Sequence, residues 1–232
     1  MTTPTRLVWL FDIDGTLLLT DGAAREAFAY AVRDRLGIAD DLSDIRFDGR
    51  TEPLILADIL GKHGLWFGEG DEARFFDAVF ARMRQTLVPP RGRLLEGVPQ
   101  LLDRVGAEPA WLAALLTGNM TEMARIKLER FGLERRFVFG AYGEEAVDRN
   151  ALARVAVARA ADFNVPPARC IVVGDTEHDI ACARAAGARA VAVATGNCTR
   201  EKLAAHDPDL LLENLADPEP LFDFARAVAA GD

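Results

Sequence analysis

The sequence predicts an α/β fold, a doubly wound parallel sheet into which a helical cap domain is inserted. From residue 92 onward, short apolar runs of strand length alternate with segments of helical periodicity, which is the pattern of repeated strand–helix units. Between residues 19 and 91 the periodicity is helical only. We therefore expect a core domain formed by residues 1–18 and 92–232, and a cap domain formed by residues 19–91.

Composition restricts the classes of partner. Half of the 232 residues are hydrophobic, which suits a globular chain with a large core. The net charge of −9 at pH 7 argues against sequence-independent binding of nucleic acid, because such binding depends on a basic surface. This charge is compatible with a small anionic substrate held in one local positive pocket. The oligomeric state is left open.

Hydropathy and cysteine usage bear on location. No apolar run approaches the roughly 18 residues that cross a bilayer, and no signal-peptide pattern precedes the first strand, so we expect neither membrane association nor a signal peptide. The odd number of cysteines, Cys170, Cys182 and Cys198, forms no CxxC pair and no metal-ligand spacing. This usage is typical of the reducing cytoplasm, and we predict a cytoplasmic protein.

The first strand is predicted over residues 7–11, a short continuous apolar run of the kind that is buried on both faces of a sheet. It ends in two carboxylates one residue apart, Asp12 and Asp14. With Ile13 turned back to the core, both acids can share one crevice beyond the end of the strand. The alternative is that Asp and Gly here only terminate a strand, as they often do.

The cap domain is predicted to hold a stripe of apolar residues over 24–36 that Gly37 ends, a helix over 54–60 that begins at Pro53 and ends at Gly61, and a stripe over 75–87 that ends before Pro89-Pro90. The later elements alternate. We expect strands over 111–116, 137–139, 170–173, 190–194 and 210–212, and helices over 99–105, 120–132, 150–161, 179–186 and 220–229.

Polar groups follow several of the predicted strands directly. They are Asp12 and Asp14, then the Thr117–Asn119 segment, and then Asp175 with Asp179 one helical step beyond. The carboxyl ends of parallel strands lie at one edge of a sheet, so these groups are expected to meet. Two carboxylates about 4 Å apart repel by about 4 kcal/mol at an effective dielectric near 20. We therefore predict a bound cation, and Mg²⁺ suits a site of carboxylates and phosphate oxygens.

The Thr117–Asn119 segment adds groups that bind anions. Thr117 supplies a hydroxyl, while Gly118 and Asn119 lead into a helix whose first N–H groups are free to bind an anion. A metal site beside an anion cradle indicates chemistry on phosphoryl groups. The alternatives are ordinary N-capping by Thr117 and Asn119, and for Asp179 a first-turn acid favoured by the helix dipole.

Three segments resemble the motifs of a known superfamily. The Asp12-Ile13-Asp14-Gly15-Thr16-Leu17 segment, the apolar strand that ends in Thr117-Gly118-Asn119, and the Gly174–Ile180 segment are similar to motifs one, two and four of the haloacid dehalogenase superfamily. The motifs occur in order over the whole chain, with a helical cap inserted after the first. The resemblance is to the phosphoglycolate-phosphatase-like branch, and it implies a Rossmann-like core.

The resemblance implies a role for each matching residue. Asp12 matches the nucleophile that forms an aspartyl phosphate, and Asp14 matches the general acid and base, whose backbone carbonyl also binds the metal. Asp175 and Asp179 match metal ligands, so that the metal set is Asp12, Asp14, Asp175 and Asp179. The residues that match phosphate-binding positions are Gly15, Thr16, Thr117, Gly118 and Asn119.

The third motif departs from the usual pattern. The superfamily generally has a lysine there, but this chain has none between Lys127 and Lys202. Arg149 occupies the expected place, and a guanidinium can bind phosphate, so we predict this role for it; a surface arginine paired with Asp148 is the alternative. In the cap, Arg50 is predicted to meet a substrate carboxylate or second phosphate, although a solvated loop arginine fits as well.

The resemblance favours one reaction and leaves others open. The expected function is Mg²⁺-dependent hydrolysis of a small phosphorylated metabolite, because Asp14 stands where dehalogenases and phosphonate hydrolases lack the acid. A mutase similar to β-phosphoglucomutase uses the same two aspartates. A third hypothesis belongs to another class, a phospho-accepting signalling module with an acidic pocket, against which Asp14 and the large cap argue.

Overall fold

The computed structural model describes residues 6–231 and contains a six-stranded sheet in the order β5-β4-β1-β6-β7-β8, in which every pair of neighbours is parallel. The α/β doubly wound fold expected from the sequence is confirmed. Its strands are β1 (Leu7–Phe11), β4 (Trp111–Leu116), β5 (Gly140–Ala141), β6 (Cys170–Gly174), β7 (Arg189–Val193) and β8 (Leu210–Leu212).

The central strand β1 is apolar on both faces, which is why it reads as a continuous hydrophobic run. Leu7, Trp9 and Phe11 pack on one side with helices α4 (Val98–Ala107) and α9 (Glu219–Ala230). Val8 and Leu10 pack on the other side with α6 (Arg149–Ala161) and α7 (Glu177–Ala185). Helices therefore cover both faces of the sheet. Shorter elements are α8 (Arg200–Ala204), η1 (Gly143–Glu145) and η2 (Pro167–Arg169).

The strand order contains a reversal that prepares a binding crevice. The chain starts at β1 in the middle, moves outward through β4 and β5, and then returns to β6 on the other side of β1 before moving outward through β7 and β8. In sheets of this kind a crevice opens at the carboxyl ends of the strands where the direction reverses. The ends of β4, β1 and β6, which are neighbours, meet there.

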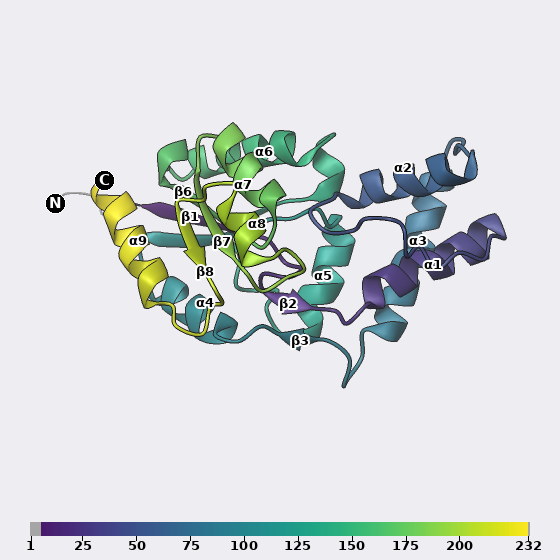
Figure 1. The fold of residues 1–232 in the computed structure, drawn as a ribbon, viewed down its shortest axis with the longest axis horizontal. Coiled ribbons are helices and arrows are strands. Elements are labelled where there is room, and N and C mark those ends of the chain that lie inside the picture. The colour runs from purple at the N-terminus through teal and green to yellow at the C-terminus, as the bar shows by residue number, and fades with distance from the viewer. Residues whose placement is uncertain (1–5, 232) are drawn as a thin grey trace.

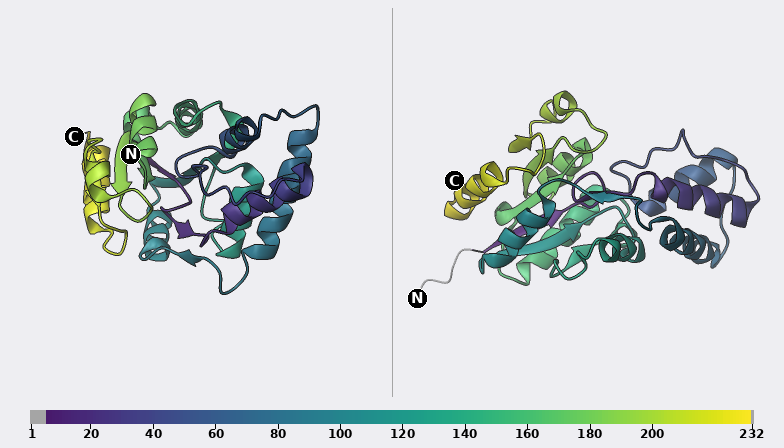
Figure 2. Two further views of the ribbon diagram at one scale, coloured as in Figure 1. Left: turned by 45° about the vertical axis from the view of Figure 1, so that its right-hand side comes forward. Right: turned by 90° about the horizontal axis from the view of Figure 1, so that it is seen from below.

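The segment between β1 and β4 is mainly helical. Helices α1 (Ala23–Leu36), α2 (Glu52–His63) and α3 (Asp71–Thr86) lie together at one end of the molecule, to the right in Figure 1, with α9 at the opposite end. Figure 2 shows the same separation from two further directions. Helices α1, α2 and α3 share a core that includes Phe28, Ile59 and Phe75, and residues of α5 (Thr121–Arg130) pack against this core.

A short antiparallel pair, β2 (Leu18–Leu19) and β3 (Arg93–Leu94), lies where the chain enters and leaves this helical segment. The predicted domain limits, 18/19 and 91/92, fall at this pair, and the division itself stays a prediction. None of the helices in residues 6–231 combines the length and the apolar character required to traverse a bilayer.

Two predicted elements were misplaced. The strand expected over 137–139 is wrong, because the strand is β5 at Gly140 and Ala141, whose pairing with Leu115 and Leu116 overrides their low strand propensity. The helix expected to end at Gly61 continues to His63 as part of α2. It ends there because Gly64, not Gly61, adopts the left-handed conformation of a helix cap.

Candidate active site

The turn after β1 holds Asp12 and Asp14 on either side of a buried residue. The Asp12 N–H donates to Val173 O at 3.0 Å, which joins this residue to β6. Ile13 is buried, and its carbonyl accepts the N–H groups of Leu17 and Leu18 at 2.9 and 3.1 Å. The turn therefore points Ile13 into the core and leaves both carboxylates at the sheet edge, as the sequence predicted.

Gly15 lets this turn approach the end of β6. Its φ of 76° lies in the left-handed region, and a Cβ there would stand 2.4 Å from Asp175 Oδ2. The Gly15 carbonyl accepts the Thr195 hydroxyl at 2.6 Å, which ties the turn to the segment after β7. Gly15 thus serves the close approach of Asp12 and Asp175, besides the phosphate-binding role that the resemblance implies.

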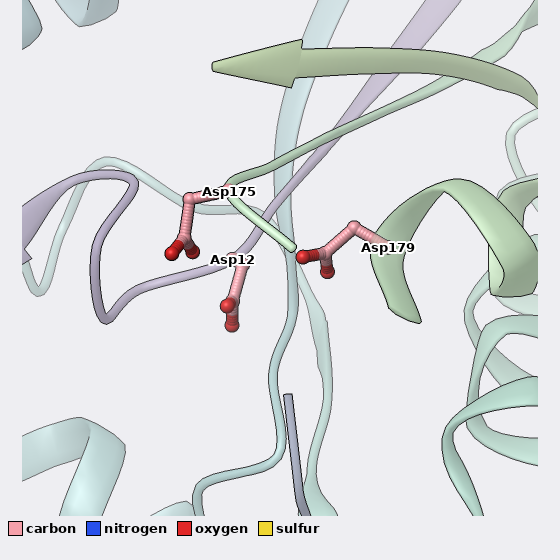
Figure 3. Close-up of side chains that lie close together, drawn as sticks. All are labelled: Asp12, Asp175 and Asp179. Atoms are coloured by element: carbon pink, nitrogen blue, oxygen red, sulfur yellow. The ribbon is translucent and has the colours of Figure 1, made fainter. Parts of the chain in front are cut away.

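Asp12, Asp175 and Asp179 form an acidic cluster at the ends of β1 and β6 and in the first turn of α7 (Figure 3). One carboxylate oxygen from each lies within 4.8 Å of those of the other two. All three residues are buried, the most exposed being Asp12 at 6%. The structure therefore brings together three of the four predicted metal ligands by their side chains.

Burial and mutual repulsion disturb the acids of this cluster. Burial raises the pKa of Asp12 from 3.8 to about 6, against the opposing effect of Arg149. Burial, followed by the charges of Asp179 and Asp12, raises the pKa of Asp175 well above its ordinary value. Both shifts mean that burial and the neighbouring acids oppose full ionisation of the cluster.

Arg149 is the cation of this cluster. It is the first residue of α6 and is buried, with its Nη2 3.2 Å from Asp12 Oδ2 and in an ion pair with Asp179. The alternative of a surface arginine paired with Asp148 is wrong, because Asp148 instead caps α6 by accepting the Ala151 N–H at 2.8 Å. The contact of Arg149 with phosphate stays a prediction.

Asp179 combines the two roles that the sequence left open. Its Oδ2 accepts the Thr176 N–H at 3.0 Å and the Thr176 hydroxyl at 2.7 Å, so that it forms a capping box at the start of α7. Its Oδ1 pairs with Arg149. The N-terminal capping fixes the carboxyl in the acidic cluster, so capping and a place in the cluster do not exclude each other.

Asp14 lies in a second group, with Asn119 and Lys127, that we call the lysine group. Lys127 Nζ donates to the two Asp14 oxygens at 2.6 and 2.8 Å and to Asn119 Oδ1 at 2.6 Å. The Asn119 amide also donates to Asp14 Oδ2 at 2.8 Å. The side chain of Lys127 is 2% exposed. Asn119 therefore meets Asp14, the predicted acid and base.

Sequence reasoning missed Lys127. In the sequence, Lys127 marks only the start of a stretch without lysine. In the structure, it lies on α5, on the same helical stripe as Met123 and Ala124. A lysine in a stripe of buried apolar positions is rarely buried unless it is paired. That exception in the pattern was the signal, although the sequence could not indicate which acid would be the partner.

The two predicted threonines are buried, and their hydroxyls have protein partners. Thr16 Oγ1 lies 3.3 Å from Asp175 Oδ1, to which it donates, and Thr117 Oγ1 accepts the Asn119 amide at 2.7 Å. Among the described residues, neither is part of the cavity lining given below. Their phosphate contacts stay predictions, and here the threonines orient Asp175 and Asn119.

The cap contacts the segment after β4 through Arg50 and Glu52. The Glu52 N–H donates to Gly118 O at 2.9 Å, and Glu52 Oε2 accepts the Met120 N–H at 2.8 Å. A Cβ on Gly118 would lie 2.1 Å from Arg50 O, so glycine permits this contact. Burial raises the pKa of Glu52 from 4.5 to about 8, an effect that the charge of Lys127 opposes. Glu52 was not predicted as a site residue.

Arg50 lines the site but its guanidinium has a partner. It forms an ion pair with Asp58 of α2 and is 31% exposed. The structure therefore brings Arg50 to the cavity, as the sequence predicted, with its charge already paired inside the cap. A contact with a substrate anion stays a prediction.

A cavity of about 340 Å³ opens between the core and the cap. Its core side contains members of both groups described above, and its cap side mixes apolar and charged residues. The lining includes Asp12, Asp14, Asn119, Lys127, Arg149 and Asp175 from the core, and Asp21, Arg25, Phe28, Phe47, Arg50 and Glu52 from the cap. The volume suits a small molecule, most of whose surface the lining would cover.

The acidic cluster fits a divalent cation. Its donors are carboxylate oxygens within 4.8 Å of one another, which is the donor type that Mg²⁺ prefers. The raised pKa values of Asp12 and Asp175 give a second indication, because a cation would relieve the repulsion that helps to cause them.

Comparisons with known proteins relate this chain to phosphatases in sequence and to a solved structure in fold. A family model described as HAD-hydrolase-like matches residues 149–218. The chain is 28% identical over 208 residues to a phosphoglycolate phosphatase of Synechococcus elongatus, covering 90% of this chain and 93% of that one. It is 27% identical over 211 residues to a 5'-nucleotidase of Pseudomonas aeruginosa, covering 89% and 91%. The crystal structure of CbbY from Rhodobacter sphaeroides in complex with phosphate has a similar fold, with a TM-score of 0.76, 21% identity, and coverage of 92% of this chain and 96% of that chain.

Proposed function

We propose that this chain, which belongs to the haloacid dehalogenase superfamily of hydrolases, is a Mg²⁺-dependent phosphatase that hydrolyses phosphate monoesters of small molecules through an aspartyl phosphate on Asp12. One observation carries the proposal. A buried cluster of carboxylates around Asp12 shares a cavity with Asp14, a carboxyl held by its own cation. The first arrangement suits a nucleophile beside a metal, and the second suits proton transfer.

In the first step, a carboxylate oxygen of Asp12 attacks the phosphorus of the bound ester. The bond between phosphorus and the ester oxygen breaks, and that oxygen takes the proton of Asp14, which enters this step as the neutral carboxylic acid and leaves it as a carboxylate. Arg149, 3.2 Å from Asp12 Oδ2, stabilises negative charge on the nucleophile and the phosphoryl group. The product of this step is an aspartyl phosphate on Asp12 and a free alcohol.

In the second step, water attacks the phosphorus of the aspartyl phosphate and Asp14 accepts a proton from that water. The bond between phosphorus and the Asp12 oxygen breaks, which releases inorganic phosphate and restores the carboxylate. The same Asp14 group therefore acts as acid and then as base, and the enzyme returns to its starting state. The cap contributes by surrounding the substrate and excluding other water.

The residues that would hold Mg²⁺ are Asp12, Asp175 and Asp179, with the Asp14 backbone carbonyl that the family resemblance adds. When bound, the ion would neutralise charge on the phosphoryl oxygens.

Free, buried cysteines at positions 170, 182 and 198 support the further proposal of a reducing, cytoplasmic location.

The natural substrate is proposed only by class. Relatives named as a phosphoglycolate phosphatase and a 5'-nucleotidase support a small phosphorylated metabolite. The cavity of about 340 Å³ supports the same size class. Among small phosphorylated metabolites, we propose a substrate similar to phosphoglycolate, because the chain resembles the phosphoglycolate-phosphatase-like branch of the superfamily.

The test is a panel of phosphate esters that includes 4-nitrophenyl phosphate, 2-phosphoglycolate, nucleoside 5'-monophosphates and sugar phosphates. We expect release of inorganic phosphate from at least one ester with Mg²⁺, and none above background with excess EDTA. Activity that EDTA leaves unchanged would contradict the metal dependence. Isomerisation of a sugar phosphate faster than phosphate release would indicate a mutase instead. A stable phosphoprotein without turnover would indicate a phospho-accepting module.

A further inference from the structure

Lys127 is a buried ammonium group that the mechanism above leaves without a task. Its helix, α5, begins two residues after Asn119 and carries Lys127 on the face turned to the cavity. Removing an ammonium group from water costs several kcal/mol unless it is paired and hydrogen-bonded. Within the described residues, the hydrogen bonds of Lys127 Nζ go to two side chains, Asp14 and Asn119, at 2.6–2.8 Å.

These bonds restrain the Asp14 carboxyl strongly. The Asp14 side chain is 42% exposed, so packing alone would leave it free to rotate. Lys127 donates to both of its oxygens, and the Asn119 amide donates to one of them at 2.8 Å. Asn119 is itself held by Lys127 and by the Thr117 hydroxyl at 2.7 Å. The end of β4 and helix α5 thus fix the carboxyl from one side.

The other buried cation of the cavity does not perform this task. In residues 6–231, the ion pairs of Arg149 are with Asp12 and Asp179, not with Asp14. Lys127 in turn bonds to Asp14 and Asn119, which lie outside the acidic cluster. The two buried cations therefore pair with different acids: Arg149 with Asp12 and Asp179, and Lys127 with Asp14.

We infer that Lys127 is the positioning residue for Asp14: together with Asn119, it holds the carboxyl in the orientation in which protons pass to the leaving oxygen and from water. The inference rests on the proposed function, because it assigns Lys127 a part in the proton transfers of Asp14. Lys127 acts through Asp14 and makes no bond that forms or breaks.

A double-mutant cycle tests it, with Lys127→Met, Asp14→Asn and the double variant assayed on an alkyl phosphate that the wild type hydrolyses. We expect Asp14→Asn to lower kcat about 10²–10⁴-fold and Lys127→Met about 10–100-fold. In the Asp14→Asn background, Lys127→Met should lower kcat by a further factor of less than about three, because the two residues act as a unit. Arg125→Met, on the exposed side of the same helix, is the matched control and should stay within about twofold of the wild type.

The leaving group supplies a readout that structural damage would not produce. 4-Nitrophenolate departs without a proton, so in single-turnover assays Lys127→Met should slow alkyl-ester cleavage at least about tenfold more than cleavage of 4-nitrophenyl phosphate. Independent, multiplying losses in the cycle, or equal losses for both esters, would overturn the inference. Should Lys127→Met not fold, Lys127→Gln runs the same cycle. A wild type that releases no phosphate from any ester would instead refute the proposed function, whatever the variants do.

Discussion

The two sides of the cavity balance their charges differently. In the acidic cluster, three buried carboxyl groups share one guanidinium, that of Arg149, so the fully ionised cluster has two negative charges in excess. In the lysine group, the single carboxylate of Asp14 faces the single ammonium of Lys127. The excess on the first side equals the charge of one divalent cation, whereas the second side needs no ion.

The two sides of the cavity are therefore suited to different chemistry. The unbalanced side raises the pKa of Asp12 to about 6, mainly through burial, and is arranged to receive a cation. The balanced side holds a carboxyl in place by direct hydrogen bonds and leaves it partly open to water. A nucleophile beside a metal needs the first environment, and a proton-transfer group needs the second.

Replacing Asp12, the proposed nucleophile, should reduce activity more than any other change to the acidic cluster. Asp12→Asn keeps the shape of the side chain but removes the carboxylate that we propose attacks phosphorus, so we expect turnover of 4-nitrophenyl phosphate to fall by at least about 10⁴-fold. The measurement is release of 4-nitrophenol with Mg²⁺ present. Asp34→Asn, on the exposed surface of α1, is the control. Full retained activity in Asp12→Asn would refute Asp12 as the nucleophile.

Removing Arg149 should increase the excess of negative charge in the acidic cluster. Without the guanidinium the cluster has three excess negative charges, so Arg149→Met should destabilise the metal-free protein by about 3–5 kcal/mol. It should also widen the rise in Tm that Mg²⁺ produces, because the ion then relieves a greater repulsion. Turnover should fall about 10²-fold.

Thermal unfolding with and without Mg²⁺ provides the measurement for Arg149→Met, and Arg125→Met serves again as the surface control. An unchanged or smaller effect of Mg²⁺ on Tm would show that Arg149 does not share the cluster with the ion. That result would remove the contrast between the two sides.

Glu52 offers the smallest effect and probes the cap beside the lysine group. Its pKa is raised by burial from 4.5 to about 8, so its contribution to stability is full below pH 4.5 and is lost as the pH rises through 8. Within that window the folded protein should lose up to about 1.4 kcal/mol per pH unit through this group. Glu52→Gln, which keeps an oxygen for the Met120 N–H, should remove that slope.

Urea unfolding at pH 5.5, 7.0 and 8.5 measures this slope for the wild type and Glu52→Gln. The variant should gain stability relative to the wild type as the pH rises. Glu129→Gln, an exposed residue of α5, is the matched control. Parallel pH profiles for wild type and Glu52→Gln would contradict a buried, protonated Glu52.

The acidic cluster could be predicted because it follows from local patterns. Asp12 and Asp175 each come directly after an apolar run, and the carboxyl ends of adjacent parallel strands meet at one edge whatever the details of packing. Asp179 follows in the first turn of the next helix. Strand periodicity and the order of the elements were therefore sufficient to bring these acids together.

The partner of Asp14 could not be predicted in this way. Lys127 lies 113 residues from Asp14 along the chain, and their contact depends on how α5 is rotated against the sheet, which the packing of many side chains sets. The contact of Glu52 with Gly118 depends likewise on how the cap docks. Periodicity specifies which residues are buried, whereas only the assembled structure decides which buried charges meet.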